Sequence, residues 1–333
     1  MKRVTIKDVA REAGVSYSAV SRAFTEGASI APETRARIEA AAKALNYRPS
    51  LLARGLVQSR SNIVTLVCGS MADPFDALFM EALAGAMAQV GKRLMLVPAS
   101  VYADDGSALL QALDDQADAA VVSAGTVSLE TAELCVHAGL PVVLAGRVLD
   151  QDGIDSVVAE NADGGRQAAD LFLRTGCLRP AYLGQARETF SDRERGDGFC
   201  DAVRSGGQVA QRHRLDGADD AAIYQTALRI LSAPDAPDAV FCATDRIAIG
   251  VIEAARALGL AIPSALSVIG FNNIPAAARR SFGLTTVDYP VDRVVTEIMM
   301  LLDRRLGEPA VRASTRRIPV GLVVRDTTRR VDA

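Results

Sequence analysis

Apolar side chains in the first part of the chain recur at the spacing of amphipathic helices. One face of a predicted first helix carries four of them, Ile6, Val9, Ala10 and Ala13. Thr5 is a favourable N-cap, and Asp8 three residues later gives the spacing of a capping box. Gly14 then ends the helix, so the pattern predicts a short helix followed by a tight turn.

A second helix is predicted directly after this turn. Val15 is an apolar turn residue, Ser16 is a suitable N-cap, and Val20 and Phe24 at the i, i+4 spacing direct one face inward. The opposite face then carries Tyr17, Ser18, Ala19, Ser21 and Arg22. Two short helices joined at a glycine are typical of a helix-turn-helix motif.

The residue types on this outer face suit a helix whose N-terminal end enters the major groove of DNA. Tyrosine and serine hydroxyls bond to base edges or phosphates, Ala19 can contact a thymine methyl group, and Arg22 can bind guanine or phosphate. The alternative is an ordinary exposed helical hairpin, because short hairpins with a glycine turn are common.

A third helix and a short hinge are predicted next. Pro32 starts the helix, which we expect to run through Leu45 and to pack Ile38, Ala41, Ala42 and Leu45 on the first two helices. Ala31 is an N-cap weaker by ~1 kcal/mol than a hydroxyl residue. Residues 50–56 can form a helix that is marginal alone and is loosened by Gly55. The alternative for this stretch is a plain linker, which we expect for residues 58–62.

From Ile63 onward, short apolar runs alternate with amphipathic helical patterns, which predicts an α/β fold with parallel sheets. Strands are expected at residues 63–68, 94–97, 119–122, 142–144, 181–183, 240–242 and 268–270. Helices are expected at residues 75–90, 107–113, 129–138, 162–175, 193–204, 221–231, 247–258 and 290–306. The second half repeats the first, so two similar lobes are predicted.

Charge is unevenly distributed along the 333 residues. Residues 1–60 carry 11 Lys and Arg against 5 Asp and Glu, whereas the rest of the chain carries 26 against 35. The basic part is the segment that holds the helix-turn-helix, as contact with nucleic acid requires. The acidic remainder argues against a second DNA-binding surface.

The cysteines and histidines indicate neither disulfides nor a metal site. Five cysteines lie at 68, 135, 177, 200 and 242 without CxxC pairing, and we expect small buried side chains in a reducing compartment. His137 and His213 are the only histidines, so no His/Cys metal cluster is expected. We expect no signal peptide and no membrane span, because no long apolar stretch follows the charged first residues.

The runs VTIKDVAREAGVSYSAVSRAF and PETRARIEAAAKALNYRPSLLARGL resemble the N-terminus of the lactose-repressor (LacI) family of bacterial transcription regulators, and the resemblance continues through the chain. It implies an all-α helix-turn-helix headpiece (residues 1–48), a hinge and linker (49–62), and a periplasmic-binding-protein-like core (63–333). Lobe one would span about 63–160 plus 290–318, and lobe two about 161–289 plus 319–333. Crossings between lobes are expected near residues 161–165, 289–290 and 318–324.

The resemblance also implies which residues contact DNA. In the headpiece these are Thr5, Ser16, Tyr17, Ser18, Ala19, Ser21, Arg22 and Tyr47. In the hinge, paired helices from two subunits would enter the minor groove, where Leu56 wedges into a base step, Ala53 allows close approach and Arg54 supplies charge.

Effector contacts are expected at the carboxyl ends of the parallel strands. Asp73 and Phe75 stand where the family usually has Asn-Pro-Phe; the alternative role of Asp73 is helix capping. Arg195 matches the arginine of the family's R-x-x-G-F motif, and its fork suits a carboxylate or adjacent hydroxyls. A helix-surface ion pair is the alternative for Arg195. Ser191, one turn earlier, can add a hydroxyl contact.

Three further positions depart from the family pattern. Thr244 replaces a usual ligand-facing Asn, and Asn272 replaces an Asp that typically binds sugar hydroxyls. The segment Ala145-Gly146-Arg147 lacks a frequent Asp and presents Arg147 nearby. Our hypothesis is an anionic effector, a sugar acid or phosphorylated sugar, bound by Arg195 and Arg147. The alternative is that these substitutions only reshape a pocket for a neutral sugar.

The sequence therefore predicts a cytoplasmic, nucleoid-associated homodimeric regulator, a repressor without cofactor, that binds a pseudo-palindromic operator and responds to a small molecule. A solute-binding protein of a transporter shares the core fold but does not account for the basic headpiece or the missing signal peptide. An α/β enzyme is the second rival, and the sequence lacks a P-loop, a G-x-S-x-G elbow and a metal cluster.

Overall fold

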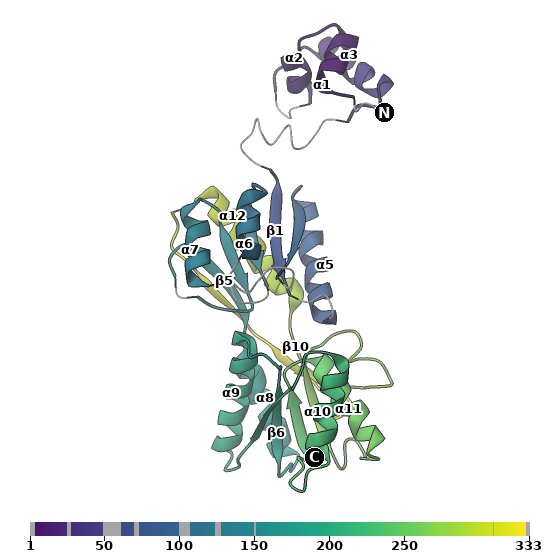
Figure 1. The fold of residues 1–333 in the computed structure, drawn as a ribbon, viewed down its shortest axis with the longest axis vertical. Helices are drawn as coiled ribbons and strands as arrows, with labels where there is room; N and C mark the ends of the chain where they lie inside the picture. Colours follow the sequence, from purple (N-terminus) through teal and green to yellow (C-terminus); the bar gives the residue numbers. More distant parts are fainter. Residues whose placement is uncertain are drawn as a thin grey trace. The chain divides into compact units, whose positions relative to one another are not determined.

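The computed structural model describes residues 4–24, 28–48, 61–69, 73–99, 107–123, 128–149, 151–308 and 310–330. The chain divides into two compact units, residues 1–62 and 63–333 (Figure 1). The predicted hinge contacts Ala53, Arg54 and Leu56 lie outside the described residues. No helix among the described residues is long and apolar enough to span a membrane.

The predicted hinge helix at residues 50–56 lies outside the described residues, which in the first unit form the other three predicted helices, α1 (Ile6–Ala13), α2 (Tyr17–Ala23) and α3 (Pro32–Ala44). Their predicted caps are confirmed. Asp8 Oδ2 accepts hydrogen bonds from the Thr5 backbone N–H at 2.9 Å and the Thr5 hydroxyl at 2.7 Å. Gly14 ends α1 with φ of 63°, and the Ser16 hydroxyl accepts a hydrogen bond from the N–H of Ala19.

A small apolar core holds these helices together. Val9, Val20 and Ile38 are fully buried, one from each helix. Two arginines of α3 complete the packing, because Arg37 donates to the carbonyl of Ala13 at 2.6 Å and Arg35 donates to that of Ala23. These carbonyls end α1 and α2, so α3 caps both helices of the motif.

Within its described residues, the second unit contains two six-stranded sheets, and lobe one is built on the sheet β11-β5-β4-β3-β1-β2. All neighbouring strands of this sheet are parallel. Its strands are β1 (Ile63–Cys68), β2 (Arg93–Pro98), β3 (Ala119–Val122), β4 (Val142–Ala145), β5 (Ile154–Ala159) and β11 (Thr315–Ile318). Its helices are α5 (Pro74–Gln89), α6 (Ser107–Asp114), α7 (Leu129–His137) and α12 (Val291–Gly307) (Figure 1).

Lobe two is built on the sheet β12-β10-β9-β8-β6-β7. The strands are β6 (Pro180–Gly184), β7 (Gln211–Arg214), β8 (Ala239–Cys242), β9 (Ser267–Asn272), β10 (Thr285–Asp288) and β12 (Gly321–Val323). Its helices are α8 (Asn161–Arg174), α9 (Phe190–Ser205), α10 (Asp220–Leu231) and α11 (Asp245–Ala257) (Figure 1).

One edge strand departs from the prediction of parallel sheets. β12 pairs with β10 in antiparallel register, whereas every other pairing in lobe two is parallel. β10 runs toward lobe one, where the chain continues into α12, and β12 arrives from lobe one after β11. The two strands therefore point in opposite directions. The chain passes between the lobes three times, after β5, β10 and β11.

The cysteines are small core side chains, as predicted. Cys68, Cys135, Cys177 and Cys242 are buried, Cys200 is partly buried, and all five are free thiols. Burial raises the pKa of the Cys135 thiol to about 11, so this group stays protonated. Among the described residues, no three His, Cys, Asp or Glu side chains gather as they would around a metal ion.

Candidate functional site

The outer face of α2 presents three predicted DNA contacts to solvent. The Tyr17 side chain is 67% exposed, and Ser18 and Arg22 are also exposed. Ala19 and Ser21 are half-buried at the edge of this face. We call Tyr17, Ser18, Ala19, Ser21 and Arg22 the α2 face.

The other predicted headpiece contacts have structural partners. The hydroxyl of Thr5 is part of the α1 capping box, and that of Ser16 caps α2. Tyr47 is half-buried, and its ring centroid lies 6.2 Å from that of Phe24. These three side chains hold the helices that carry the α2 face.

Two glycines determine where Arg195 lies in lobe two. Helices α8 and α9 pack so closely that a Cβ atom on Gly165 would overlap the backbone of Arg195, and one on Gly198 would overlap the backbone of Ala162. The glycine of the Arg195-Gly-Asp-Gly198-Phe motif therefore allows backbone contact between the helices. This contact places Arg195 against the first crossing between the lobes.

The guanidinium of Arg195 is held on two sides. Its Nε donates to Asn161 Oδ1 at 2.9 Å, and its Nη1 donates to the carbonyl of Ala243 at 2.6 Å. Its carbon lies 3.5 Å from the centroid of the Phe271 ring, in a cation-π contact. The alternative of a helix-surface ion pair is wrong, because Arg195 is 5% exposed and forms no ion pair with any described residue.

The carboxylates near Arg195 bind other groups. Asp192 accepts from the Tyr182 hydroxyl at 2.6 Å and from Arg214 at 3.1 Å. Asp245 accepts from the Ile274 N–H at 2.8 Å, and burial raises the pKa of this carboxyl to about 7. Burial lowers the pKa of Arg195 itself. The result is a buried cation without a direct counter-ion within the described part of the chain.

An aromatic pair lies at the second crossing between the lobes. The rings of Phe75, from α5, and Tyr289, after β10, meet edge to face with centroids 4.8 Å apart. Tyr289 is 7% exposed. Burial raises the pKa of its hydroxyl to about 12, although the positive charge of Arg195 acts to lower it. Asp73 caps α5 by accepting from the Phe75 N–H at 2.9 Å. The sequence analysis placed Tyr289 near a crossing between the lobes but did not select it as a candidate site residue.

The ends of β8 and β9 carry two further predicted contacts. The hydroxyl of Thr244 caps α11 by accepting from the Ile247 N–H at 3.3 Å. Asn272 has φ of 109°, and its buried Oδ1 accepts no hydrogen bond from any described residue. A buried carbonyl oxygen without a donor is costly, so Asn272 offers an acceptor that a ligand hydroxyl or N–H can satisfy.

The remaining predicted contacts, Arg147 and Ser191, lie where the lobes meet. Ser191 donates to the carbonyl of Gly146 at 2.8 Å, which joins α9 to the loop after β4. Arg147 is half-buried, and burial lowers the pKa of its guanidinium. Asn161 donates to the Ser191 hydroxyl and accepts from Arg195 Nε. Sequence reasoning did not select Asn161.

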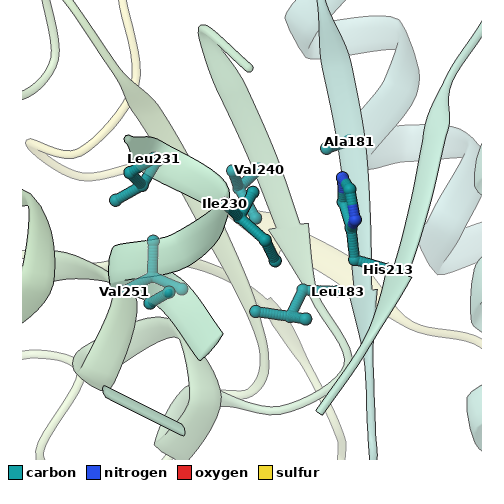
Figure 2. Close-up of a pocket in the computed structure, with 8 residues that line it drawn as sticks. Ala181, Leu183, His213, Ile230, Leu231, Val240 and Val251 are labelled. Atoms are coloured by element: carbon teal, nitrogen blue, oxygen red, sulfur yellow. The ribbon is translucent and has the colours of Figure 1, made fainter. Parts of the chain in front are cut away.

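A small pocket inside lobe two is unrelated to these residues. Figure 2 shows it between α10, α11 and the strands β6, β7 and β8, with apolar walls and one imidazole, that of His213. Burial lowers the pKa of His213, so the ring is neutral. The space has room for about one water molecule, which is too little for a metabolite.

Comparison with known proteins gives the family. Residues 5–50 match the lacI family of bacterial regulatory proteins, and residues 169–328 match a periplasmic binding protein-like domain. The chain is 31% identical over 306 residues to the HTH-type transcriptional repressor PurR of Erwinia tasmaniensis, covering 90% of both chains. The chain belongs to the LacI family. It is also 28% identical over 331 residues to catabolite control protein A of Priestia megaterium, covering 98% of this chain and 99% of the relative.

Solved structures of transcription regulators share the fold. The lac repressor dimer bound to operator and the anti-inducer ONPF has a TM-score of 0.86 at 24% identity, and the match covers 98% of this chain and 99% of that one. The CelR–cellobiose complex has a TM-score of 0.70 at 24% identity, covering 98% of this chain and all of that one. The helix-turn-helix unit and the two-lobed core predicted from the sequence are confirmed, and the chain is a transcription regulator of this family.

Proposed function

We propose that this LacI-family chain is a cytoplasmic repressor that binds a pseudo-palindromic operator as a homodimer and is switched by an anionic small molecule. The observation that carries the effector class is the buried Arg195 guanidinium without a carboxylate partner. We infer no enzymatic activity, since the regulatory role accounts for the residues that gather at the site.

The exposed α2 face supports DNA as the partner. Tyr17, Ser18 and Arg22 supply hydroxyl donors and a guanidinium on one solvent-facing surface, while Thr5 and Ser16 fix the helix ends. The relatives PurR and catabolite control protein A carry regulatory names, and the lac repressor structure holds operator DNA as a dimer. We propose that Ala53, Arg54 and Leu56 contact the minor groove between the two half-sites.

The chemistry around Arg195 supports an anion as the effector. Burying a guanidinium costs roughly several kcal/mol unless hydrogen bonds and an opposite charge compensate the lost hydration. Asn161, the Ala243 carbonyl and the Phe271 ring supply neutral compensation only. A ligand carboxylate or phosphate would supply the missing charge, with Arg147 as a second cation and Asn272 accepting from a ligand hydroxyl.

A neutral sugar is the second candidate. The CelR structure contains cellobiose, and a LacI-family regulator from Enterococcus faecium contains ribose, at 24% and 20% identity to this chain. Thr244 and Asn272 are uncharged, as a site for sugar hydroxyls allows. Under this candidate, the Arg195 fork binds two adjacent hydroxyls and its charge stays uncompensated.

The proposed switch acts through the angle between the lobes. A ligand that binds one lobe arrangement more tightly shifts the population toward it and changes the spacing of the paired hinges. Coupling of about 1–3 kcal/mol is enough for a useful change in DNA affinity.

The experiment that tests the effector class is a thermal-unfolding screen of the full chain against sugars, sugar acids, sugar phosphates and nucleobases. A ligand that binds only the folded state raises the unfolding temperature. We expect stabilisation by acids or phosphates that is lost in Arg195→Met. Stabilisation confined to neutral sugars and kept in Arg195→Met would overturn the anionic effector and leave the regulator in place.

A further inference from the structure

Helix α9 belongs to lobe two, yet its first two turns contact lobe one. Ser191 donates to the carbonyl of Gly146, in the loop that follows β4 of lobe one. Glu194 forms an ion pair with Arg317, on β11 at the edge of the lobe-one sheet. The same two turns carry Arg195, the residue at the centre of the proposed effector site.

The ion pair between Glu194 and Arg317 joins the lobes side chain to side chain. Arg317 Nη2 lies 2.9 Å from Glu194 Oε1, and Nη1 lies 3.4 Å from Oε2, so the fork faces both carboxylate oxygens. The side chain of Glu194 is 18% exposed and that of Arg317 is 40% exposed. Partial burial of Glu194 limits screening of this pair by solvent.

Asn161 connects this ion pair to Arg195. Its side chain is fully buried at the first crossing between the lobes. Its Oδ1 accepts from Arg195 Nε at 2.9 Å, and its Nδ2 lies 3.3 Å from Glu194 Oε2 and 3.4 Å from Ser191 Oγ. One amide at the crossing therefore orients the side chains of all three α9 residues.

We propose that Ser191, Glu194 and Arg317 form an interlobe clamp that holds the lobe angle described here, and that Asn161 is the positioning residue that ties the clamp to Arg195. A ligand that draws the Arg195 guanidinium toward itself pulls on Asn161 and hence on Glu194. The clamp is the element through which occupancy of the site changes the lobe angle. This role rests on the proposed function in two respects: Arg195 is the group that binds the effector, and the lobe angle is the quantity that controls DNA binding.

The neighbouring residue Arg316 provides a matched control. It lies on the same strand and pairs with Glu297 of α12 at 3.6 Å, so its ion pair stays within lobe one. The side chains of Arg316 and Arg317 are 50% and 40% exposed. Replacing either by leucine removes one arginine from β11, but only Arg317→Leu breaks a contact between lobes.

The experiment measures the distance between the lobes by pulsed electron–electron resonance in the full chain, without DNA or ligand. Noncanonical amino acids carry the spin labels at Leu134 of lobe one and Val209 of lobe two, which are 51% and 87% exposed. We expect Arg317→Leu to change the population ratio between the described arrangement and longer distances about two- to fivefold, in line with a partly exposed ion pair.

The controls decide the interpretation. Arg316→Leu should keep the distribution of the unsubstituted chain, and Arg317→Lys, which retains a positive charge, should recover part of the shift. The clamp is overturned if Arg317→Leu leaves the distribution unchanged or if Arg316→Leu shifts it equally far. Neither result depends on operator or effector, so failure of the clamp and failure of the proposed function are told apart.

Discussion

The guanidinium carbon of Arg195 lies 3.5 Å from the centroid of the Phe271 ring, so that a buried cation rests on an aromatic face. A desolvated contact of this kind is worth about 2 kcal/mol. We expect Phe271→Leu to lower the free energy of unfolding by about 2–4 kcal/mol, part through lost packing and part through the lost cation-π contact.

A double-mutant cycle with Arg195→Met separates these two parts. Phe271→Leu should cost less in the Arg195→Met background, because the cation is already absent there. Urea unfolding of the four proteins measures the difference. Equal costs in both backgrounds would show that the ring acts by packing alone.

The close approach of α8 and α9 predicts opposite results for two glycine substitutions. A Cβ atom on Gly198 would overlap the backbone of Ala162, which cannot move aside as a flexible side chain does. Gly198→Ala should therefore destabilise the chain by about 1–3 kcal/mol. Gly85→Ala in α5 is the control, because its Cβ atom meets nothing within 4 Å and should stabilise the helix by about 0.5–1 kcal/mol. Urea unfolding measures both changes. The tight contact would be refuted if neither variant were less stable than the unsubstituted chain.

Asp76 predicts a pH dependence of stability. Burial, followed by the charge of Asp73, raises the pKa of this carboxyl to about 7, above the ordinary value near 4 in the unfolded chain. The stabilising contribution is present below about pH 4 and is lost as the pH rises to about 7, because the unfolded chain ionises first. Asp76→Asn should match the unsubstituted chain at pH 4 and exceed it in unfolding free energy at pH 8. A constant difference across this range would contradict the raised pKa.

A buried ion pair fixes α12 to β5 in lobe one. Asp155 is fully buried, accepts from Arg305 Nη2 at 2.8 Å and Nε at 3.0 Å, and accepts from the Ser314 N–H. Asp155→Ala leaves the buried Arg305 without this partner and should cost about 3–5 kcal/mol.

The control for that substitution is an exposed pair. Asp201 and Arg204 are 68% and 73% exposed and 2.8 Å apart, so Asp201→Ala should change the unfolding free energy by less than about 1 kcal/mol. Similar values for the two substitutions, measured by urea unfolding, would show that burial does not distinguish these pairs.

Much of the fold was predictable because its elements have strong local patterns. The caps of α1 and α2, and strands with continuous apolar runs such as residues 119–122, were located within one or two residues. Five strands were missed, β5, β7, β10, β11 and β12, and their patterns are weaker. Asp155 and Ser156 interrupt β5, two threonines begin β10, and β11 contains two arginines. β7 contains four polar residues, Gln211–Arg214, at a sheet edge, and β12 is three residues long and is stabilised by its antiparallel partner. Edge pairing depends on tertiary contacts that periodicity does not reveal.

The candidate site was predictable where a local sequence motif marks it and not where distant segments meet. Arg195 was selected through its motif. Its burial follows from the close packing of α8 and α9, which a glycine of the same motif allows. Asn161 and Tyr289 were named only as crossings, since nothing in the local sequence shows that they contact Arg195 and Phe75. The Glu194–Arg317 pair spans 123 residues and required the fold to be seen.

The most direct test of the regulator is selection of random DNA duplexes by the full chain, followed by affinity measurements at increasing salt. We predict enrichment of two inverted half-sites, with affinity falling steeply between low and physiological salt as phosphate contacts release counter-ions. Arg22→Ala on the exposed α2 face should abolish the enrichment or change the preferred half-site. Recovery of no common sequence, together with an affinity that salt and Arg22→Ala leave unchanged, would contradict sequence-specific DNA binding by this chain.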